Sequence, residues 1–374
     1  MNSKDIIENL LLKADIKING SRPWDITVHN NEVFDHILRF GTLGIGETYM
    51  DGLWDCKQLD EMINKAMVAN IPEKLSGQEK LSLVLKKIQQ IINPQKISKV
   101  KKDVPFHYDK GNLLFENMLD KHMTYTCAYW KNAEDLDQAQ ENKLNLVCKK
   151  LNLKPSMNVL DIGCGWGSFM KFASENYQVQ CDGLTLSKEQ KKLGETRCKH
   201  LPVNFILNDY REFDPNKQYD RIVSIGMLEH VGPKNYHDFF RCAHKLMKDD
   251  GVFLLHTIGG FASVQETDPW IKKYIFPNGV IPSLSQLGCS MEKKFIVEDL
   301  HNIGPNYDKT LMAWYNNFHK NWKIISDHYD ERFYRMWKFY LLSCAGSFRS
   351  RVLNTWQFAL TKIGTPYHES VRSV

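Results

Sequence analysis

The sequence predicts an α/β protein with a doubly wound, mainly parallel sheet, preceded by a small, mainly helical N-terminal domain. Three observations predict this fold class. Strand-like and helix-like segments alternate between residues 157 and 258, which is typical of parallel strands joined by crossover helices. A glycine-rich loop joins the first of these strands to a helix. Before residue 95 the apolar residues recur at helical spacing instead.

Length and composition fit a folded protein. The chain has 374 residues, of which 43% are hydrophobic and 25% charged. Its net charge of +5 is too small to indicate nucleic-acid binding. The nine cysteines form no C-x-x-C pair, so we expect no metal site or disulfide framework but reduced thiols in a cytoplasmic protein. We find no signal peptide and no membrane-spanning apolar run, so we expect any contact of the protein with a membrane to be at the membrane surface.

Helices are predicted near the N-terminus, where apolar residues recur at helical spacing in Ile6–Leu11 and Val33–Leu38. The glycine-rich stretch between Gly41 and Gly52 is predicted to be a compact, turn-rich connection. It does not match a phosphate loop, because no buried strand precedes it and no Lys-Ser/Thr follows it. The predicted domains are residues 1–95 and residues 96–374.

A lysine-rich segment lies at the predicted domain boundary. Residues 74–102 contain eight lysines and one acidic residue. Apolar residues between Leu81 and Ile92 recur at three- and four-residue spacing, which predicts an amphipathic basic helix. Such a helix either docks on anionic lipid or packs its apolar face on a neighbouring domain with its lysines in water. On this segment alone we favour packing.

The α/β elements follow in order. Strands are predicted at residues 157–161, 179–184, 203–208, 220–225 and 251–258, and helices at 169–176, 187–198 and 236–247. Ser187 and Gln190 have the spacing of a capping box, which predicts where the second of these helices begins.

The loop after the first strand indicates the ligand. Residues 161–167, Asp-Ile-Gly-Cys-Gly-Trp-Gly, have glycine at every second position between a strand and a helix. The dinucleotide pattern G-x-G-x-x-G is not matched, because the third glycine comes one position early. The loop instead resembles the S-adenosylmethionine-binding loop of class I methyltransferases, which implies a Rossmann-like sheet. The alternative is a purely structural turn.

This chain differs from typical class I methyltransferases at the second strand. They usually carry an acidic residue there to bind the ribose hydroxyls, whereas residues 183–187 here offer only hydroxyl groups. We therefore expect the ribose to bind elsewhere, with Gln190 as a candidate. Asp209 and Tyr210, after the third strand, are candidates for holding the adenine.

Several longer motifs are more specific. The chain resembles the cyclopropane-fatty-acyl-phospholipid synthases, relatives of the mycolic acid cyclopropane synthases, essentially from end to end. The matching stretches are GTLGIGETYMDGLWDC, HYDKGNLLF, MTYTCAYW, LDIGCGWGSF, RIVSIGMLEHVGPKNY, FLLHTIG, DPWIKKYIFPNG and TLMAWYNNF. The resemblance implies transfer of a methylene group from S-adenosylmethionine to the cis double bond of an acyl chain in a membrane phospholipid. The cofactor residues that we expect are Tyr125, Thr126, Asp161, Gly163, Gly165, Gly167, Thr185, Leu186, Ser187, Gln190, Asp209 and Tyr210.

The resemblance also implies the chemistry of ring closure. Methyl transfer leaves a carbocation, which aromatic faces can stabilise, and a bound bicarbonate is the general base that removes a methyl proton. The residues similar to the bicarbonate ligands are Cys127, Glu229, His256, the backbone of Ile258, and Tyr315. Glu229 would accept the hydroxyl proton of the bicarbonate, while His256 and Tyr315 would orient it.

Each of these residues has a structural alternative. Cys127 could be a small buried residue, Glu229 with His230 could brace the cofactor loop, and His256 could be a core histidine. The alternative functions are a fatty acyl C-methyltransferase that gives methyl-branched or hydroxylated chains, a catalytically silent lipid-binding homologue, and a soluble small-molecule methyltransferase.

The implied substrate changes the interpretation of the lysine-rich segment. An enzyme that acts on phospholipid must reach the bilayer, and this favours docking over packing. The candidate headgroup contacts are Lys96, Lys99, Lys101 and Lys102. We expect a homodimer in the cytoplasm that binds peripherally to the anionic inner membrane surface. Residues 1–95 would then serve lipid engagement or dimer contacts, and residues 96–374 would carry out catalysis.

Overall fold

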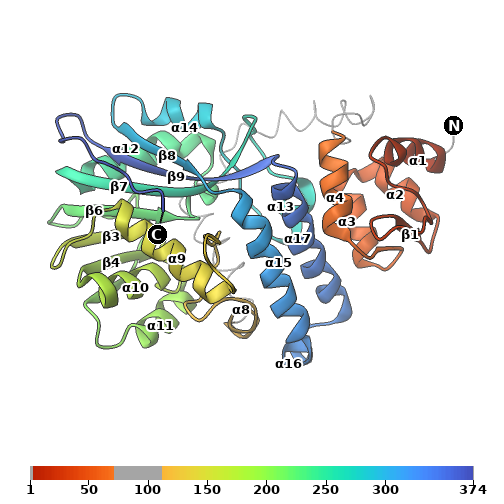
Figure 1. Ribbon diagram of the computed structural model, residues 1–374, viewed down its shortest axis with the longest axis horizontal. Helices are drawn as coiled ribbons and strands as arrows, with labels where there is room; N and C mark the ends of the chain where they lie inside the picture. The colour runs from red at the N-terminus through yellow and green to blue at the C-terminus, as the bar shows by residue number, and fades with distance from the viewer. Residues whose placement is uncertain (1–2, 71–111, 374) are drawn as a thin grey trace. The chain divides into compact units, whose positions relative to one another are not determined.

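The computed structural model describes residues 3–70 and 112–373 (Figure 1). The chain forms two compact units. Unit 1 joins the N-terminal part with Glu266–Pro277 and Tyr307–Leu353, and unit 2 contains the remainder. The predicted domains meet at a single boundary near residue 95. In the structure, two later segments of the chain also belong to unit 1. The lysine-rich segment and the predicted boundary lie outside the described residues.

Unit 1 is mainly helical. Its N-terminal elements are α1 (Ser3–Lys13), β1 (Ile26–Val28), α2 (Glu32–Phe40), α3 (Thr42–Met50), β2 (Trp54–Cys56) and α4 (Leu59–Val68). The later ones are α13 (Pro269–Tyr274), α15 (Pro305–Lys320), α16 (Trp322–Ile325), the short η3 (Ser326–His328) and α17 (Glu331–Arg349). Helices α1 and α2 confirm the two helices predicted from apolar spacing. In the described parts of the chain, no helix has the length and apolar character needed to cross a bilayer.

The stretch between Gly41 and Gly52 is a helix, so the predicted turn-rich connection is wrong. Helix α3 occupies most of it. Its glycines permit close packing, because a β-carbon at Gly46 would lie 2.3 Å from the indole of Trp270 on α13. Glycine weakens an isolated helix, but here it lets another helix approach. Trp270 is too distant in the sequence for this contact to be predicted.

The packing role of Gly46 predicts a difference between two glycine-to-alanine variants. Gly46→Ala is expected to lower the free energy of unfolding by about 1–3 kcal/mol, because the new methyl group overpacks the Trp270 contact. Gly288 on α14 is the control: its added β-carbon would meet no atom within 4 Å. Gly288→Ala is expected to preserve or slightly raise stability. Urea unfolding followed by circular dichroism measures both, and equal stabilities would contradict the packing role.

Unit 2 contains a seven-stranded sheet in the order β5-β4-β3-β6-β7-β9-β8. The five strands from β5 to β7 are parallel, which confirms the predicted doubly wound sheet. The last two strands pair with each other antiparallel and were not predicted. The strands are β3 (Asn158–Ile162), β4 (Gln180–Thr185), β5 (Val203–Leu207), β6 (Tyr219–Ile225), β7 (Met247–Gly260), β8 (Ile296–Asn302) and β9 (Leu353–Thr361).

Helices cover both faces of this sheet (Figure 1). Alternate strand residues face opposite sides: Val159 packs in the core with α9 and α10, whereas Leu160 packs in the core with α12 and α14. The helices of unit 2 are α8 (Asn112–Met118), α9 (Leu136–Lys150), α10 (Ser168–Tyr177), α11 (Lys188–Arg197), α12 (Tyr236–Leu246) and α14 (Leu284–Met291), with the short η1 (Leu228–His230) and η2 (Pro233–Asn235). The predicted helices correspond to α10, α11 and α12.

Candidate active site

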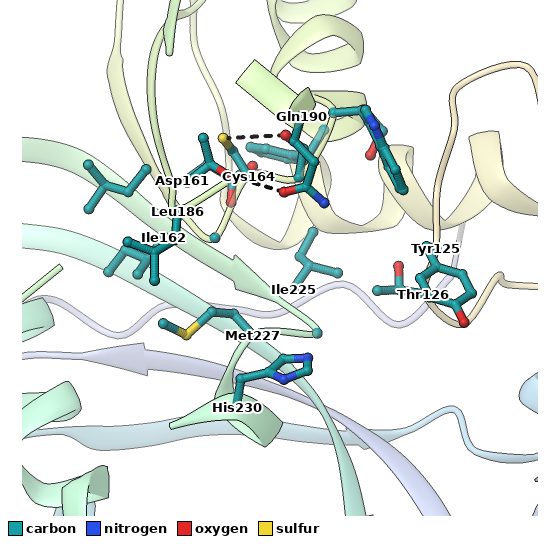
Figure 2. A pocket seen from close by; sticks show the side chains of 18 of the residues that line it. Tyr125, Thr126, Asp161, Ile162, Cys164, Leu186, Gln190, Ile225, Met227 and His230 are labelled. Atoms are coloured by element: carbon teal, nitrogen blue, oxygen red, sulfur yellow. Dashed lines mark hydrogen bonds between the residues drawn. The ribbon is translucent and has the colours of Figure 1, made fainter. Parts of the chain in front are cut away.

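A cavity in unit 2 lies at the carboxyl ends of β3, β4, β5 and β6 (Figure 2). The segment before α9, with Tyr125 and Thr126, forms another side. The strand order reverses between β3 and β6, since β4 and β5 lie on one side of β3 and β6 and β7 on the other. Ligands of open α/β sheets bind outside the carboxyl ends at such a reversal.

Most of the predicted cofactor residues line this cavity. They are Tyr125, Thr126, Asp161, Gly163, Gly165, Thr185, Leu186, Gln190, Asp209 and Tyr210. Gly167 and Ser187 are not among the lining residues. A β-carbon at Gly167 would lie 2.4 Å from Cζ of Phe205, so this glycine serves packing. Ser187 caps α11 by accepting a hydrogen bond from the Gln190 N–H at 3.2 Å.

The glycine loop has a backbone that other residues adopt only with strain. Gly163 has φ 91°, and a β-carbon there would lie 2.6 Å from Cγ of Met227. The N–H groups of Gly163 and Cys164 both donate to the Leu184 carbonyl, at 3.1 and 2.9 Å. The loop is therefore tied to the end of β4, and no side chain at Gly163 separates its backbone from the cavity.

Gln190 and Asp209, expected near the ribose and the adenine, are already hydrogen-bonded within the protein, whereas the buried Tyr210 hydroxyl has no hydrogen-bond partner among the described residues. The Thr185 hydroxyl donates to Oε1 of Gln190 at 3.1 Å, so the Gln190 side chain does not close the predicted capping box. Arg211 donates to both oxygens of Asp209, from Nε at 2.9 Å and from Nη2 at 2.8 Å. Arg211 also lines the cavity and was not predicted. The roles of Gln190 and Asp209 in cofactor binding remain predictions.

Two buried ionisable side chains, Asp161 and Lys143, also line the cavity. Oδ1 of Asp161 is buried and accepts no hydrogen bond from the described residues, and burial raises the pKa of Asp161 to about 7. Lys143 lies on α9, and burial lowers its pKa to about 8. Lys143 could not be recognised as a site residue from the sequence, because helical lysines are normally exposed and no motif marks this one.

Glu229 and Ile258, two of the predicted bicarbonate ligands, are in contact. The backbone N–H of Ile258 on β7 donates to Oε1 of Glu229 at 2.7 Å. Oε2 is buried and accepts no hydrogen bond in the described part of the chain. Burial raises the pKa of Glu229 to about 7, although the hydrogen bond from Ile258 opposes this rise. A ligand that also used the Ile258 N–H would have to share it with Glu229.

His256 is buried two residues before Ile258 on β7. Its Nδ1 lies 3.2 Å from Nε2 of Gln357 on β9. Burial lowers the pKa of His256 well below its ordinary value, so the imidazole is neutral near neutral pH. Figure 2 also shows His230 at the cavity. The sequence indicates for this histidine only a role in bracing the cofactor loop, and burial lowers its pKa to about 4.

Cys127 is fully buried, and its segment lies at the end of β6. A β-carbon at Gly226 would lie 2.6 Å from Cγ2 of Thr126, and the Gly226 N–H donates to the His256 carbonyl at 2.9 Å. The backbone therefore brings the segment with Cys127 close to the strand with His256. Tyr315 lies on α15 of unit 1, so its approach to these unit 2 residues remains a prediction.

Comparison with known proteins gives consistent matches. Residues 95–358 match the family model for mycolic acid cyclopropane synthetase. The cyclopropane-fatty-acyl-phospholipid synthase of Escherichia coli strain K12 is 47% identical over 367 residues, which cover 96% of this chain and 93% of that protein. A probable fatty acid methyltransferase of Pseudomonas putida is 33% identical and covers 69% of this chain and 68% of its own length. The crystal structure of the mycolic acid cyclopropane synthase CmaA1, complexed with SAH and CTAB, matches with a TM-score of 0.65 at 34% identity, covering 70% of this chain and 98% of CmaA1.

Proposed function

The chain belongs to the mycolic acid cyclopropane synthetase family, and from this premise we propose that it is a cyclopropane-fatty-acyl-phospholipid synthase. It transfers a methylene group from S-adenosylmethionine to the cis double bond of an unsaturated acyl chain in a membrane phospholipid. The observation that carries this proposal is the 47% identity to the Escherichia coli synthase over nearly the full length of both chains.

The cavity suits S-adenosylmethionine. The residues that would hold it are those of the glycine loop, together with Thr185 and Gln190 beside β4 and Tyr210 beyond β5. The buried Oδ1 of Asp161 lacks a hydrogen bond from the described residues, as expected for a group that completes its contacts with a ligand. The SAH complex of CmaA1 supports this assignment. When bound, the cofactor supplies an electrophilic methyl group.

The reaction requires positioning and exclusion of water. An isolated alkene is a poor nucleophile, so the methyl group and the double bond must be held close and in line. Tyr125 lines the cavity, and its ring packs edge-on against Phe115 with centroids 5.1 Å apart. An aromatic face held in this way can stabilise the carbocation that follows methyl transfer and keep water from it.

Ring closure requires removal of a methyl proton. We assign the bicarbonate site to Cys127, Glu229, His256, Ile258 and Tyr315; bicarbonate, when bound, supplies the general base. The buried Oε2 of Glu229, which accepts no hydrogen bond among the described residues, supports this assignment. A carboxyl group whose pKa is raised to about 7 can accept and release a proton near neutral pH. The neutral His256 can donate one hydrogen bond to an anion.

The substrate implies a location. Because the acyl chain lies in a bilayer, the proposal includes peripheral binding of a cytoplasmic homodimer to the anionic inner membrane surface. The predicted headgroup lysines, Lys96, Lys99, Lys101 and Lys102, lie outside the described residues.

Labelled S-adenosylmethionine and phospholipid vesicles test the proposed function. The purified chain is expected to label vesicles with cis-unsaturated acyl chains and to leave fully saturated vesicles unlabelled. Equal labelling of both would contradict an alkene substrate. If the chain instead methylates water-soluble acceptors at a rate that added vesicles do not change, a small-molecule methyltransferase would be favoured.

A methyl-branched product is the second candidate. The probable fatty acid methyltransferase from Pseudomonas putida, which is 33% identical to this chain, is the observation in its favour. Mass spectrometry of the released fatty acids separates the two, since a cyclopropane adds CH₂ whereas a saturated methyl branch adds CH₂ and two further hydrogens.

A further inference from the structure

We propose that Lys143 binds the α-carboxylate of the methionine end of the cofactor, while Asp161 receives its α-ammonium group. The inference rests on the proposed use of S-adenosylmethionine. It assigns a function to a buried lysine that no sequence motif marks, and it fixes which end of the cavity accepts the amino-acid part of the ligand.

Lys143 is a buried cation that has no direct counterion among the described residues. Its side chain is fully buried on α9 and lines the cavity. Nζ donates one hydrogen bond, to the Thr126 hydroxyl at 2.9 Å. Within residues 3–70 and 112–373, no carboxylate forms an ion pair with it. An ammonium group has three protons to donate, and a buried charge is costly unless it is paired. An anionic ligand group in the cavity would provide that pairing.

Lys150, the last residue of α9, shows the contrast. Lys150 is also fully buried, but its Nζ lies 3.3 Å from Oδ2 of Asp299 and it does not line the cavity. Of these two buried lysines on α9, Lys150 has a protein counterion, whereas Lys143 faces a space that a ligand can fill.

Asp161 provides the opposite charge in the same cavity. It is the penultimate residue of β3, just before the glycine loop, and its Oδ1 accepts no hydrogen bond among the described residues. The two groups are close enough to influence each other, because Lys143 opposes the burial-induced rise in the pKa of Asp161. A cationic donor and a carboxylate acceptor that share one cavity complement an α-amino acid, which carries both charges on one carbon.

The other ionisable groups around Lys143 are Asp120 and Cys127, and its charge also acts on His256. Asp120 is occupied with its own segment: its carboxylate accepts hydrogen bonds from the backbone N–H groups of Thr124 at 2.8 Å and His122 at 2.9 Å. Asp120 therefore acts on Lys143 through space only, since no hydrogen bond or ion pair joins the two among the described residues, and Nζ remains available to the cavity.

A purely structural role is the competing explanation. Lys143 could simply anchor the segment with Cys127 through Thr126, as Gln140 does by donating to the Thr126 carbonyl at 2.9 Å. The two explanations differ in one respect: a structural anchor supports every ligand of the cavity equally, whereas a carboxylate-binding residue supports only ligands that carry a carboxylate.

Calorimetric titration of the full chain with two ligands tests the inference. The ligands are S-adenosylhomocysteine and its decarboxylated analogue, which keeps the amino group. Lys143→Met is expected to weaken binding of S-adenosylhomocysteine by about 10- to 100-fold, the usual loss for a hydrogen bond to a charged group, and to change binding of the analogue little. Lys143→Gln, which keeps a polar side chain, is expected to give the same selective loss if the methionine variant is poorly folded.

The control is Lys150→Met, which is expected to lower stability but to keep the wild-type preference for the carboxylate-bearing ligand. An equal loss of affinity for both ligands in the two Lys143 variants would overturn the carboxylate assignment and leave the proposed function intact. Failure of the wild-type chain to bind S-adenosylhomocysteine would overturn both.

Discussion

Replacing Glu229 with glutamine is expected to lower kcat by about 100- to 10,000-fold, the range for loss of a general acid–base group. Glutamine preserves the size of the side chain, and its amide oxygen can still accept the hydrogen bond from Ile258. It cannot accept the proton that ring closure releases. Methyl transfer to unsaturated vesicles measures kcat, and calorimetry with S-adenosylhomocysteine is expected to show largely unchanged cofactor affinity. A variant that loses cofactor affinity and turnover together would indicate that Glu229 only braces the cofactor loop.

The same carboxyl group predicts the pH dependence of turnover. Burial raises the pKa of Glu229 to about 7, so the group is protonated, and unable to accept a proton, below that pH. Turnover of the wild type at saturating cofactor is therefore expected to fall as the pH is lowered through about 7. The residual activity of Glu229→Gln is expected to lack this step. Saturating cofactor is needed because the pKa of Asp161 is also raised to about 7. The same pH profile in both proteins would exclude Glu229 as the titrating group.

Gly163→Ala is expected to raise the dissociation constant of S-adenosylhomocysteine by at least about 100-fold. The backbone at φ 91° strains any residue with a β-carbon, and that carbon would lie 2.6 Å from Cγ of Met227. To relieve this clash, the loop or Met227 must move. Overpacking of this kind costs about 1–3 kcal/mol, and the backbone strain adds to it. The glycine loop and Met227 both line the cavity, so movement of either would displace the backbone that binds the ligand. Calorimetry on protein shown by circular dichroism to be folded measures the change.

Gly52→Ala is the control for Gly163→Ala. Gly52 also has a positive φ, of 74°, but an added β-carbon there would meet no atom within 4 Å. This variant is expected to lose only the stability that backbone strain costs and to bind the ligand as the wild type does. Unchanged affinity in a folded Gly163→Ala protein would show that the cavity does not depend on this loop.

The sequence predicted the parts of the fold that depend on local patterns. The five parallel strands and the helices between them have apolar spacing and glycine or polar ends that can be recognised within short windows. Strands β8 and β9 are different, because they pair across a long insertion and no local pattern shows where each one lies in the sheet. Helix α3 could not be predicted for the same reason. Its glycine Gly46 packs against Trp270 on α13, which is far away in the sequence.

The candidate site divides in a similar way. Residues after neighbouring parallel strands must meet at one edge of the sheet, so Asp161, Thr185 and Asp209 could be placed together from the sequence. Lys143 and Arg211 reach the cavity through long side chains whose direction depends on tertiary packing. That Glu229 and Ile258 belong to one site was expected from family resemblance alone, since no spacing rule relates the end of β6 to a backbone N–H of β7; their direct hydrogen bond was not predicted.

In the proposed reaction, a methyl group is transferred to an alkene and then loses one proton as the ring closes. The most direct measurement is the deuterium content of the fatty acids formed from S-adenosylmethionine whose methyl group carries three deuterons. We expect chains that keep two deuterons, because the third is removed at the Glu229 site. Chains that keep all three deuterons would contradict the proposed reaction.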